Sequence, residues 1–355
     1  MANGLFQMTD REFWEQPTKG YEPMYKQMVL GKKPGVVIDA PKVADVDGPS
    51  SVPVPLFYAQ LQKDAWGVEL VRDAIIVASR LEDRGCWAMT VQKMTGEDDE
   101  GLPDPKKLSR PSGPPPDPDR MVSKFIVTNL RETPMIPWER GTYEARVVIR
   151  DQVSNTVRSS IQDPPPAYGD PEVAKFLAAQ RAPAGIPKPV QPSPGNPLPS
   201  YARRDDSPAV PEKAGVSFQV PRVLVVQPEA TAILRLSLRL PVVRGDHVPP
   251  APPPTDPNAP PRPPRPTAIL PVHLLMTGSE EPDPLLLTLR IPVWTPLDPA
   301  VEGQEATGHA TLDLFQLYKP LREAKPQTFF IYAISGEVFS GPALMALVDK
   351  NQLRR

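Results

Sequence analysis

The sequence predicts an all-β protein built from two antiparallel β-sandwich domains, with a proline-rich tether between them and an N-terminal arm in front. Segments dense in β-branched and aromatic residues lie on both sides of residues 163–215, a stretch rich in proline. The chain has 355 residues, of which 52 are proline, yet 40% are hydrophobic. That balance is typical of a globular chain with embedded proline-rich segments, and the length suits two domains of ordinary size.

Composition excludes several classes of partner and site. The formal net charge is −2, with both signs spread along the chain, so we expect no nucleic-acid or anionic membrane surface. No apolar run is long enough to cross a bilayer, and we expect no membrane insertion. Cys86 is the single cysteine, which rules out an intramolecular disulfide and a thiolate zinc cluster.

The N-terminal arm, residues 1–35, carries large apolar side chains without a core of its own. Thr9 and Glu12 fit a capping box for a short helix that contains Phe13 and Trp14. Two interpretations stay open: the arm packs on the first domain, or it embraces a neighbouring subunit. The arm has no basic region followed by an apolar run, so we expect cytoplasmic synthesis without a signal peptide, and the final location could be a large assembly.

The first domain, residues 36–162, contains strand after strand. Residues 74–78 form an apolar run that suits a helix or a strand, and the turn-forming residues 82–85 favour the strand. In residues 140–161, alternate apolar side chains predict a strand that is covered on one face, with charged side chains on the other. The apolar set is Tyr143, Ala145, Val147 and Ile149, and the charged set is Glu144, Arg146 and Arg150.

This last stretch resembles the closing hairpin of bacterial immunoglobulin-like and fibronectin-like sandwich domains. The resemblance rests on the Gly141-Thr142-Tyr143 start and on a turn over residues 151–155 that leads into a last strand. It implies that the tyrosine hydroxyl bonds to a nearby main-chain group and that a buried tryptophan, for which Trp87 is suited, lies on an earlier strand. It implies a fold and no activity.

The tether, residues 163–215, contains one predicted helix over residues 171–181. Pro171 suits the first helical position, and Val173, Phe176 and Leu177 share one face that needs a docking surface. Residues 186–200 alternate proline with other residues, which favours an extended polyproline II spacer.

The second domain, residues 216–349, has seven predicted strands, which is typical of an immunoglobulin-sized sandwich. Leu234 and Leu236 begin an alternating apolar row, and Leu287 and Leu289 begin another. The loop over residues 249–266 is mostly proline and cannot join a sheet, and residues 350–355 form a tail. The strands are expected at residues 216–226, 232–243, 267–276, 285–294, 310–318, 327–335 and 343–348.

Two short motifs match peptides that adaptor domains bind. Pro165, Pro166 and Tyr168 match a WW ligand, and residues 260–265 match an SH3 ligand. A chain with this much proline also yields such matches by chance.

No motif indicates catalysis, a cofactor or a metal. The acidic residues 97–100 match no calcium loop, and His247, His273 and His309 accompany no nucleophile elbow. We therefore predict that the protein is not an enzyme. Trp66 and Trp138 lie beside predicted turns and suggest an exposed pair for stacking on sugars, whereas Trp87 and Trp294 are expected in the core.

These observations predict a structural or assembly protein that acts through protein–protein contacts, with copies of itself or other subunits of a complex as partners. Two alternatives stay open: a glycan- or ligand-binding sandwich module, and an adaptor that presents its proline-rich motifs. The candidate interaction residues are Phe13, Trp14, Tyr21, Tyr25, Pro165, Pro166, Tyr168, Val173, Phe176 and Leu177.

Overall fold

The computed structural model describes five stretches of the chain. They are residues 33–46, 53–91, 117–162, 200–249 and 265–349, with short gaps at 41, 62, 65–67, 69, 131–135, 138, 228–229, 280–283, 299–300 and 302. Most of the arm, the predicted helix 171–181, most of the loop 249–266 and the tail lie outside the described residues.

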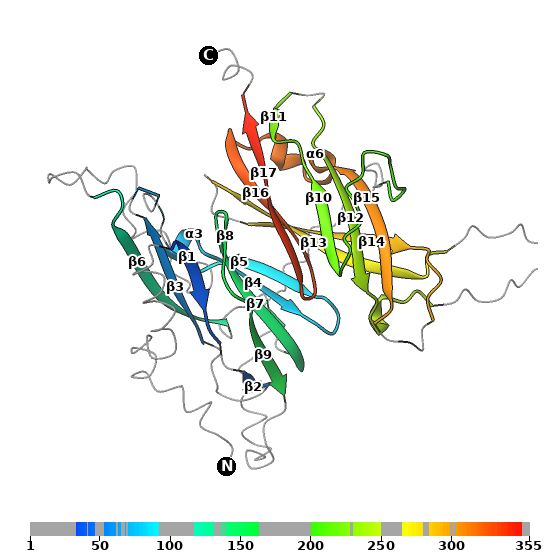
Figure 1. Cartoon of the computed structure of the whole chain (residues 1–355), viewed down its shortest axis with the longest axis horizontal. Helices are drawn as coiled ribbons and strands as arrows, with labels where there is room; N and C mark the ends of the chain where they lie inside the picture. The colour runs from blue at the N-terminus through cyan, green and yellow to red at the C-terminus, as the bar shows by residue number, and fades with distance from the viewer. Residues whose placement is uncertain are drawn as a thin grey trace, which may run out of the picture. The chain divides into compact units, whose positions relative to one another are not determined.

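The described residues are rich in β-strand and divide into two compact units (Figure 1). The first unit holds a three-stranded sheet of order β1-β3-β6 and a second sheet of order β2-β9-β7-β4-β5, in which β8 also pairs with β7. Its elements are β1 (Gly35–Ile38), β2 (Val43–Asp45), β3 (Pro53–Leu61), α3 (Leu70–Asp73), β4 (Ile75–Arg80), β5 (Cys86–Thr90), β6 (Met121–Asn129), β7 (Gly141–Ile149), β8 (Gln152–Val153) and β9 (Val157–Gln162).

The second unit holds a three-stranded sheet of order β10-β12-β15 and a five-stranded sheet of order β11-β17-β16-β13-β14. Its elements are β10 (Gly215–Gln219), β11 (Val223–Val225), β12 (Ile233–Pro241), η5 (Arg244–Asp246), β13 (Ala268–Gly278), β14 (Leu285–Val293), β15 (Glu305–Asp313), α6 (Leu314–Leu317), η6 (Lys319–Arg322), β16 (Gln327–Ser335) and β17 (Val338–Val348). The turn Glu82–Cys86 also packs within this unit.

The two units share one strand order. Taking the strands of each unit in chain order and setting β8 aside, β1 corresponds to β10, β2 to β11, β3 to β12, and so on to β9 and β17. In both units a short second strand pairs in parallel with the last strand, and the other pairings described are antiparallel. The architecture is therefore repeated within the chain.

Each unit has its own hydrophobic core, built from the alternating side chains of its strands. In the second unit Leu234, Leu236 and Leu238 are fully buried, and Leu289 and Ile291 of β14 belong to the same core. Burying each such side chain contributes about 1.5–3 kcal/mol. The predicted inward faces of β12, β14 and β7 are confirmed, because Tyr143, Ala145, Val147 and Ile149 belong to the core of the first unit.

The structure corrects three predicted strands of the second unit. The last strand, predicted at 343–348, begins already at Val338. Residues 216–226 are two strands in different sheets, because the chain changes sheets around Pro221, whose nitrogen cannot donate to a ladder. The strand predicted at 310–318 runs instead from Glu305 to Asp313. Asp313 then caps α6 by accepting a hydrogen bond from the Phe315 backbone N–H at 3.0 Å.

Two side chains also lie on a face other than the predicted one. Trp294 is 49% exposed, because it follows Val293, which points inward at the end of β14. Glu144, predicted on a solvated face, is buried. Its carboxylate is held by Arg158 Nε at 2.6 Å and by Arg146 Nη2 at 3.3 Å, which offsets the cost of removing the charge from water.

The tyrosine contact predicted from the closing hairpin is present. The Tyr143 hydroxyl donates to the Pro137 carbonyl and accepts from the Glu139 backbone N–H at 3.3 Å. Trp87, on β5, lies beside it with ring centroids 6.2 Å apart. Burial of the ring raises the pKa of Tyr143. Together these contacts tie the start of β7 to the segment before it.

We expect Tyr143→Phe to lower the free energy of unfolding by about 1 kcal/mol, because it removes the hydrogen bond from the hydroxyl to the Pro137 carbonyl and leaves the Glu139 N–H as that carbonyl's remaining donor. Urea unfolding would measure this. Tyr201→Phe is the matched control, since no hydrogen bond of the Tyr201 hydroxyl is found in the described part of the chain. An equal loss in both variants would contradict a specific role for the Tyr143 hydroxyl.

Candidate functional site

The residues chosen from the sequence lie outside the described residues, so the structure does not place them. This holds for all ten candidate interaction residues, for Trp66 and Trp138 of the glycan hypothesis and for the acidic residues 97–100. Three other places, all in the second unit, carry enough polar or open surface to be considered. They are a serine–histidine pair, a buried ion pair and an uncharged groove.

The serine–histidine pair lies on the outer face of the three-stranded sheet. Ser237 Oγ is 2.9 Å from His309 Nδ1 and donates to the Pro208 carbonyl at 2.6 Å. The hydroxyl has one proton and a carbonyl only accepts, so the imidazole must donate to the serine through Nδ1. A histidine in that tautomer cannot remove the serine proton, and Ser237 is fully buried. The pair holds the segment around Pro208 onto β12 and is not arranged for nucleophilic attack.

The buried ion pair joins Arg84, in the turn Glu82–Cys86, to Asp246 at 3.3 Å. Arg84 also donates to the Pro241 carbonyl and to Ser335 Oγ at 3.3 Å. Asp246 accepts from the Val243 backbone N–H at 3.0 Å. Burial raises the pKa of Asp246 and lowers the pKa of Arg84, in each case against the attraction of the other charge. For both groups, the loss of hydration thus shifts the pKa more than the attraction of the opposite charge does.

His273 belongs to the same buried cluster. Its Nε2 lies 2.8 Å from the Arg84 carbonyl and its Nδ1 lies 3.0 Å from Thr288 Oγ1. The carbonyl only accepts, so Nε2 carries the proton. Burial lowers the pKa of His273, although the Arg84 carbonyl opposes the shift. Both ring nitrogens have protein partners, so this imidazole is an internal structural group.

We expect the free energy of unfolding to decrease as the pH is lowered from about 7.5 to about 5. We expect His309→Asn to weaken this pH dependence. Burial lowers the pKa of His273, and burial together with Arg203 lowers that of His309. The unfolded chain, with histidine pKa values near 6.5, then binds more protons, so stability is lost as the pH falls through 6.5. Urea unfolding at a series of pH values measures the difference.

Asp246 acts in the opposite direction, because its raised pKa favours the folded chain at lower pH. Comparing wild type with His309→Asn removes that contribution, since both contain Asp246. An unchanged pH dependence in the variant would show that His309 has no such effect.

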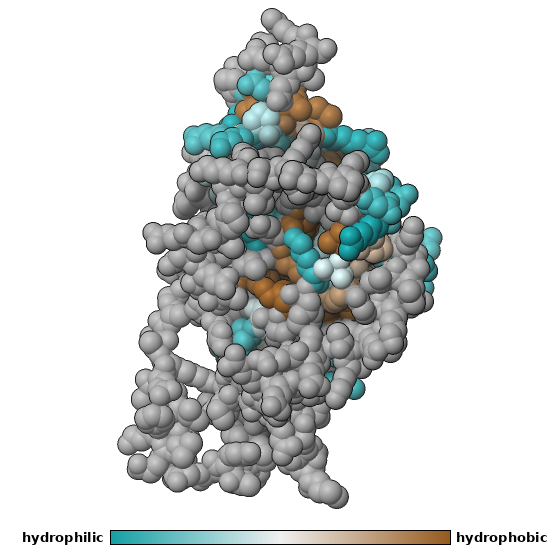
Figure 2. Space-filling view, turned by 90° about the vertical axis from the view of Figure 1, so that its left-hand side faces the viewer, coloured by the Kyte–Doolittle hydropathy of each residue, from teal (hydrophilic) through white to brown (hydrophobic). Residues whose placement is uncertain are grey.

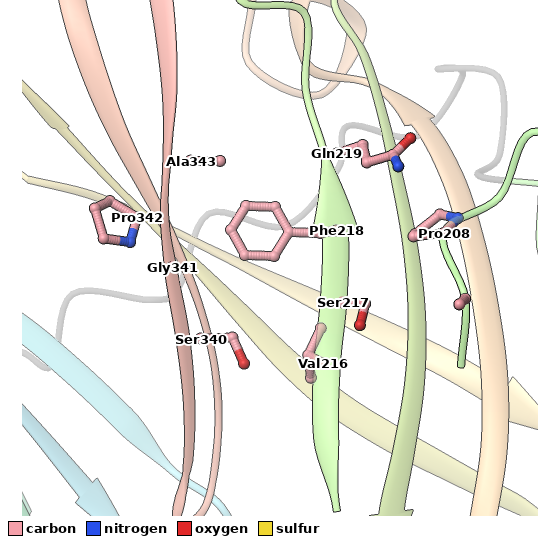
Figure 3. Close-up of a pocket in the computed structure, with 10 residues that line it drawn as sticks. Pro208, Val216, Ser217, Phe218, Gln219, Ser340, Gly341, Pro342 and Ala343 are labelled. Atoms are coloured by element: carbon pink, nitrogen blue, oxygen red, sulfur yellow. The ribbon is translucent and has the colours of Figure 1, made fainter. Parts of the chain in front are cut away.

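The uncharged groove lies between β10 of one sheet and β17 of the other, and has a volume of about 380 Å³. Residues 216–219 of β10 and 340–343 of β17 form its two walls, and Pro208 and Ala209 complete the lining. Figure 3 shows the Phe218 ring between the two strands, on the side of β10 that faces β17. None of the lining side chains is ionisable. The groove can therefore take an uncharged chain or an apolar group, and offers no acid–base chemistry.

Both walls of the groove are strand edges. Among the described strands β10 pairs only with β12, and β11 pairs with β17 only at Ala346–Val348, beyond the groove. At the corresponding edge of the first unit, a side chain covers Ile38, the last residue of β1. There the Asn155 amide accepts from the Ile38 N–H of β1 and donates to the Ile38 carbonyl, both at 2.9 Å. An unpaired edge is a ready template for another chain, so the groove is the more open of the two.

A bulge at Gly341 shapes the β17 wall. The register of β17 against β16 shifts between Ile331 and Ala333, opposite this point. Gly341 has a φ of +124°, and a Cβ there would lie 2.7 Å from the Ile331 carbonyl oxygen. Only glycine fits both conditions. In the sequence, a glycine beside Pro342 inside a predicted hairpin was the only local sign of this groove.

We expect Gly341→Ala to destabilise the protein by about 2–3 kcal/mol, because it adds backbone strain and a clash with a carbonyl. Gly245→Ala is the matched control, since a Cβ at Gly245 would meet nothing within 4 Å. The control should change the free energy of unfolding by less than about 0.5 kcal/mol. Similar losses in the two variants, measured by urea unfolding, would contradict the strain assigned to Gly341.

Among the residues that the structure describes, few other large apolar side chains are exposed. On the face that Figure 2 shows, described hydrophobic and hydrophilic residues are interspersed. Large hydrophobic side chains that stand out among the described residues are Val223, Trp294, Val301 and Leu344, each about half exposed. Trp294 alone does not form the aromatic pair that the glycan hypothesis requires.

No metal cluster or membrane-spanning helix is found among the residues that the structure describes. The described residues contain no group of three or more His, Cys, Asp or Glu side chains placed to hold a metal ion. No helix in the described part of the chain is long and apolar enough to cross a membrane. No protein-family model matches the sequence, and no curated protein matches it either.

Proposed function

We propose that this chain is a non-enzymatic structural or assembly protein, which works through protein–protein contacts with further copies of itself. The observation that carries the proposal is the uncharged groove between β10 and β17, whose walls are two strand edges without a described partner. Unpaired edges beside an uncharged surface favour association with another chain over chemistry on a small molecule.

The polar clusters support the same proposal. Ser237 and His309 are committed to holding the segment around Pro208, and Arg84, Asp246 and His273 are bonded among themselves and to backbone carbonyls. Chemistry at these clusters would require them to break contacts that support the fold.

We further propose that both units are immunoglobulin-like sandwiches and that the proline-rich residues 163–215 contain a tether between them. The shared strand order, the parallel pairing of the last strand and the Tyr143 contact with Pro137 support this assignment. Such a fold is a scaffold without a fixed activity, which is consistent with a role in assembly.

We expect the full chain to self-associate as its concentration rises from about 1 to about 100 µM in sedimentation velocity. Phe218→Ala should weaken this association about tenfold, because it removes the aromatic wall of the groove. Trp294→Ala, which truncates an exposed aromatic residue outside the groove lining, is the control and should behave like wild type. A chain that stays monomeric across the whole range would contradict the proposal.

A further inference from the structure

We propose that the groove between β10 and β17 binds the uncharged proline-rich run at residues 249–255 of a second copy of this chain. This inference rests on the proposed function and names the partner of the same groove. Residues 250–264 lie outside the described residues, and the run is identified by its composition and by the place at which the chain leaves the second unit.

The chemistry of the groove selects the kind of ligand. Its lining combines the Phe218 ring with Pro208 and Pro342 and contains no ionisable side chain. A charged peptide would lose hydration there without gaining a partner. An extended proline-rich peptide suits an aromatic-lined groove, because its backbone is already ordered before it binds and its carbonyls are free to accept hydrogen bonds.

The length of the β10 wall matches one turn of polyproline II helix. The β10 wall runs over four residues, 216–219, and therefore extends about 10 Å at the rise of a strand. Three residues of polyproline II cover about 9 Å. The run at residues 249–255 reads Pro-Pro-Ala-Pro-Pro-Pro-Thr, so it contains more than one turn of uncharged, proline-rich chain.

The position of the run favours a second copy over the same one. Val248 is fixed by a 3.0 Å hydrogen bond from its N–H to the Thr267 carbonyl, next to the start of β13. The groove lies level with Leu274 of β13, because Leu274 and Ser340 both pair with Ala333 of β16. Val248 and the groove are separated by six residues along β13 and by two strand spacings across the sheet. Together these amount to a distance of about 22 Å.

That distance is about the full length of the run. Seven residues of polyproline II extend about 22 Å, so within one copy only the last of them would reach its own groove. The chain then continues with Asp256, which the uncharged lining does not match. A second copy can place the whole run along the groove without this restriction.

The test uses a fluorescently labelled synthetic peptide of residues 248–255, titrated into the full chain and followed by anisotropy. We expect saturable binding that is lost when the prolines of the peptide are replaced by serine. Ala343→Glu places a carboxylate in the groove and should weaken binding at least about tenfold. Leu344→Glu is the matched control, because it adds the same charge at the next residue, which lies on the opposite face of β17 and is half exposed. This variant should bind the peptide as wild type does.

Sedimentation of the same samples separates this proposal from the proposed function. Self-association that is reduced when residues 249–264 are replaced by a Gly-Ser linker of equal length supports the exchange between copies. No peptide binding at about 1 mM, in a chain that still self-associates, overturns the groove assignment and leaves assembly standing. Binding that is much stronger in the linker variant than in wild type, at a concentration at which sedimentation shows both to be monomeric, would place the run in its own groove and overturn the second copy.

Discussion

The fold of each unit depends on the alternation of apolar and polar side chains along its central strands. In β12 the inward leucines are almost completely buried, and their neighbours Arg235, Ser237 and Arg239 face outward. A strand of this kind buries one face only, so the chain must bring a second sheet against it. Two sheets that pack face to face leave their lateral edges open unless another element covers them. The groove beside β10 is a consequence of that constraint.

The two units have the same strand order, but the edge of β1 and the corresponding edge of β10 differ in what covers them. In the first unit a single side chain, Asn155, satisfies both backbone groups of Ile38 and so protects the edge of β1 at that residue. In the second unit the equivalent position is a groove lined by Phe218 and by a bulged part of β17. A repeated architecture thus carries one protected edge and one edge suited to a partner.

Much of the fold could be predicted from local patterns, and the errors have physical reasons. The inward sets of β7, β12 and β14 followed directly from a period of two. The strand at 216–226 was predicted as one element, because a propensity pattern cannot tell that its halves pair with β12 and with β17. The burial of Glu144 was missed for a related reason, since its partner Arg158 lies on another strand, fourteen residues away. None of the residues chosen as interaction sites is placed by the structure, and those predictions stay untested.

The sequence by itself determined that the chain is β-rich, where most of its strands begin and end, which side chains of the regular strands face inward, and that residues 336 and 337 turn the last hairpin. Each of these properties depends on neighbours along the chain. The groove was decided only by the tertiary structure, because an edge is unpaired or closed according to which distant strands lie beside it. Phe218 and Ala343, more than a hundred residues apart, form one surface for that reason alone.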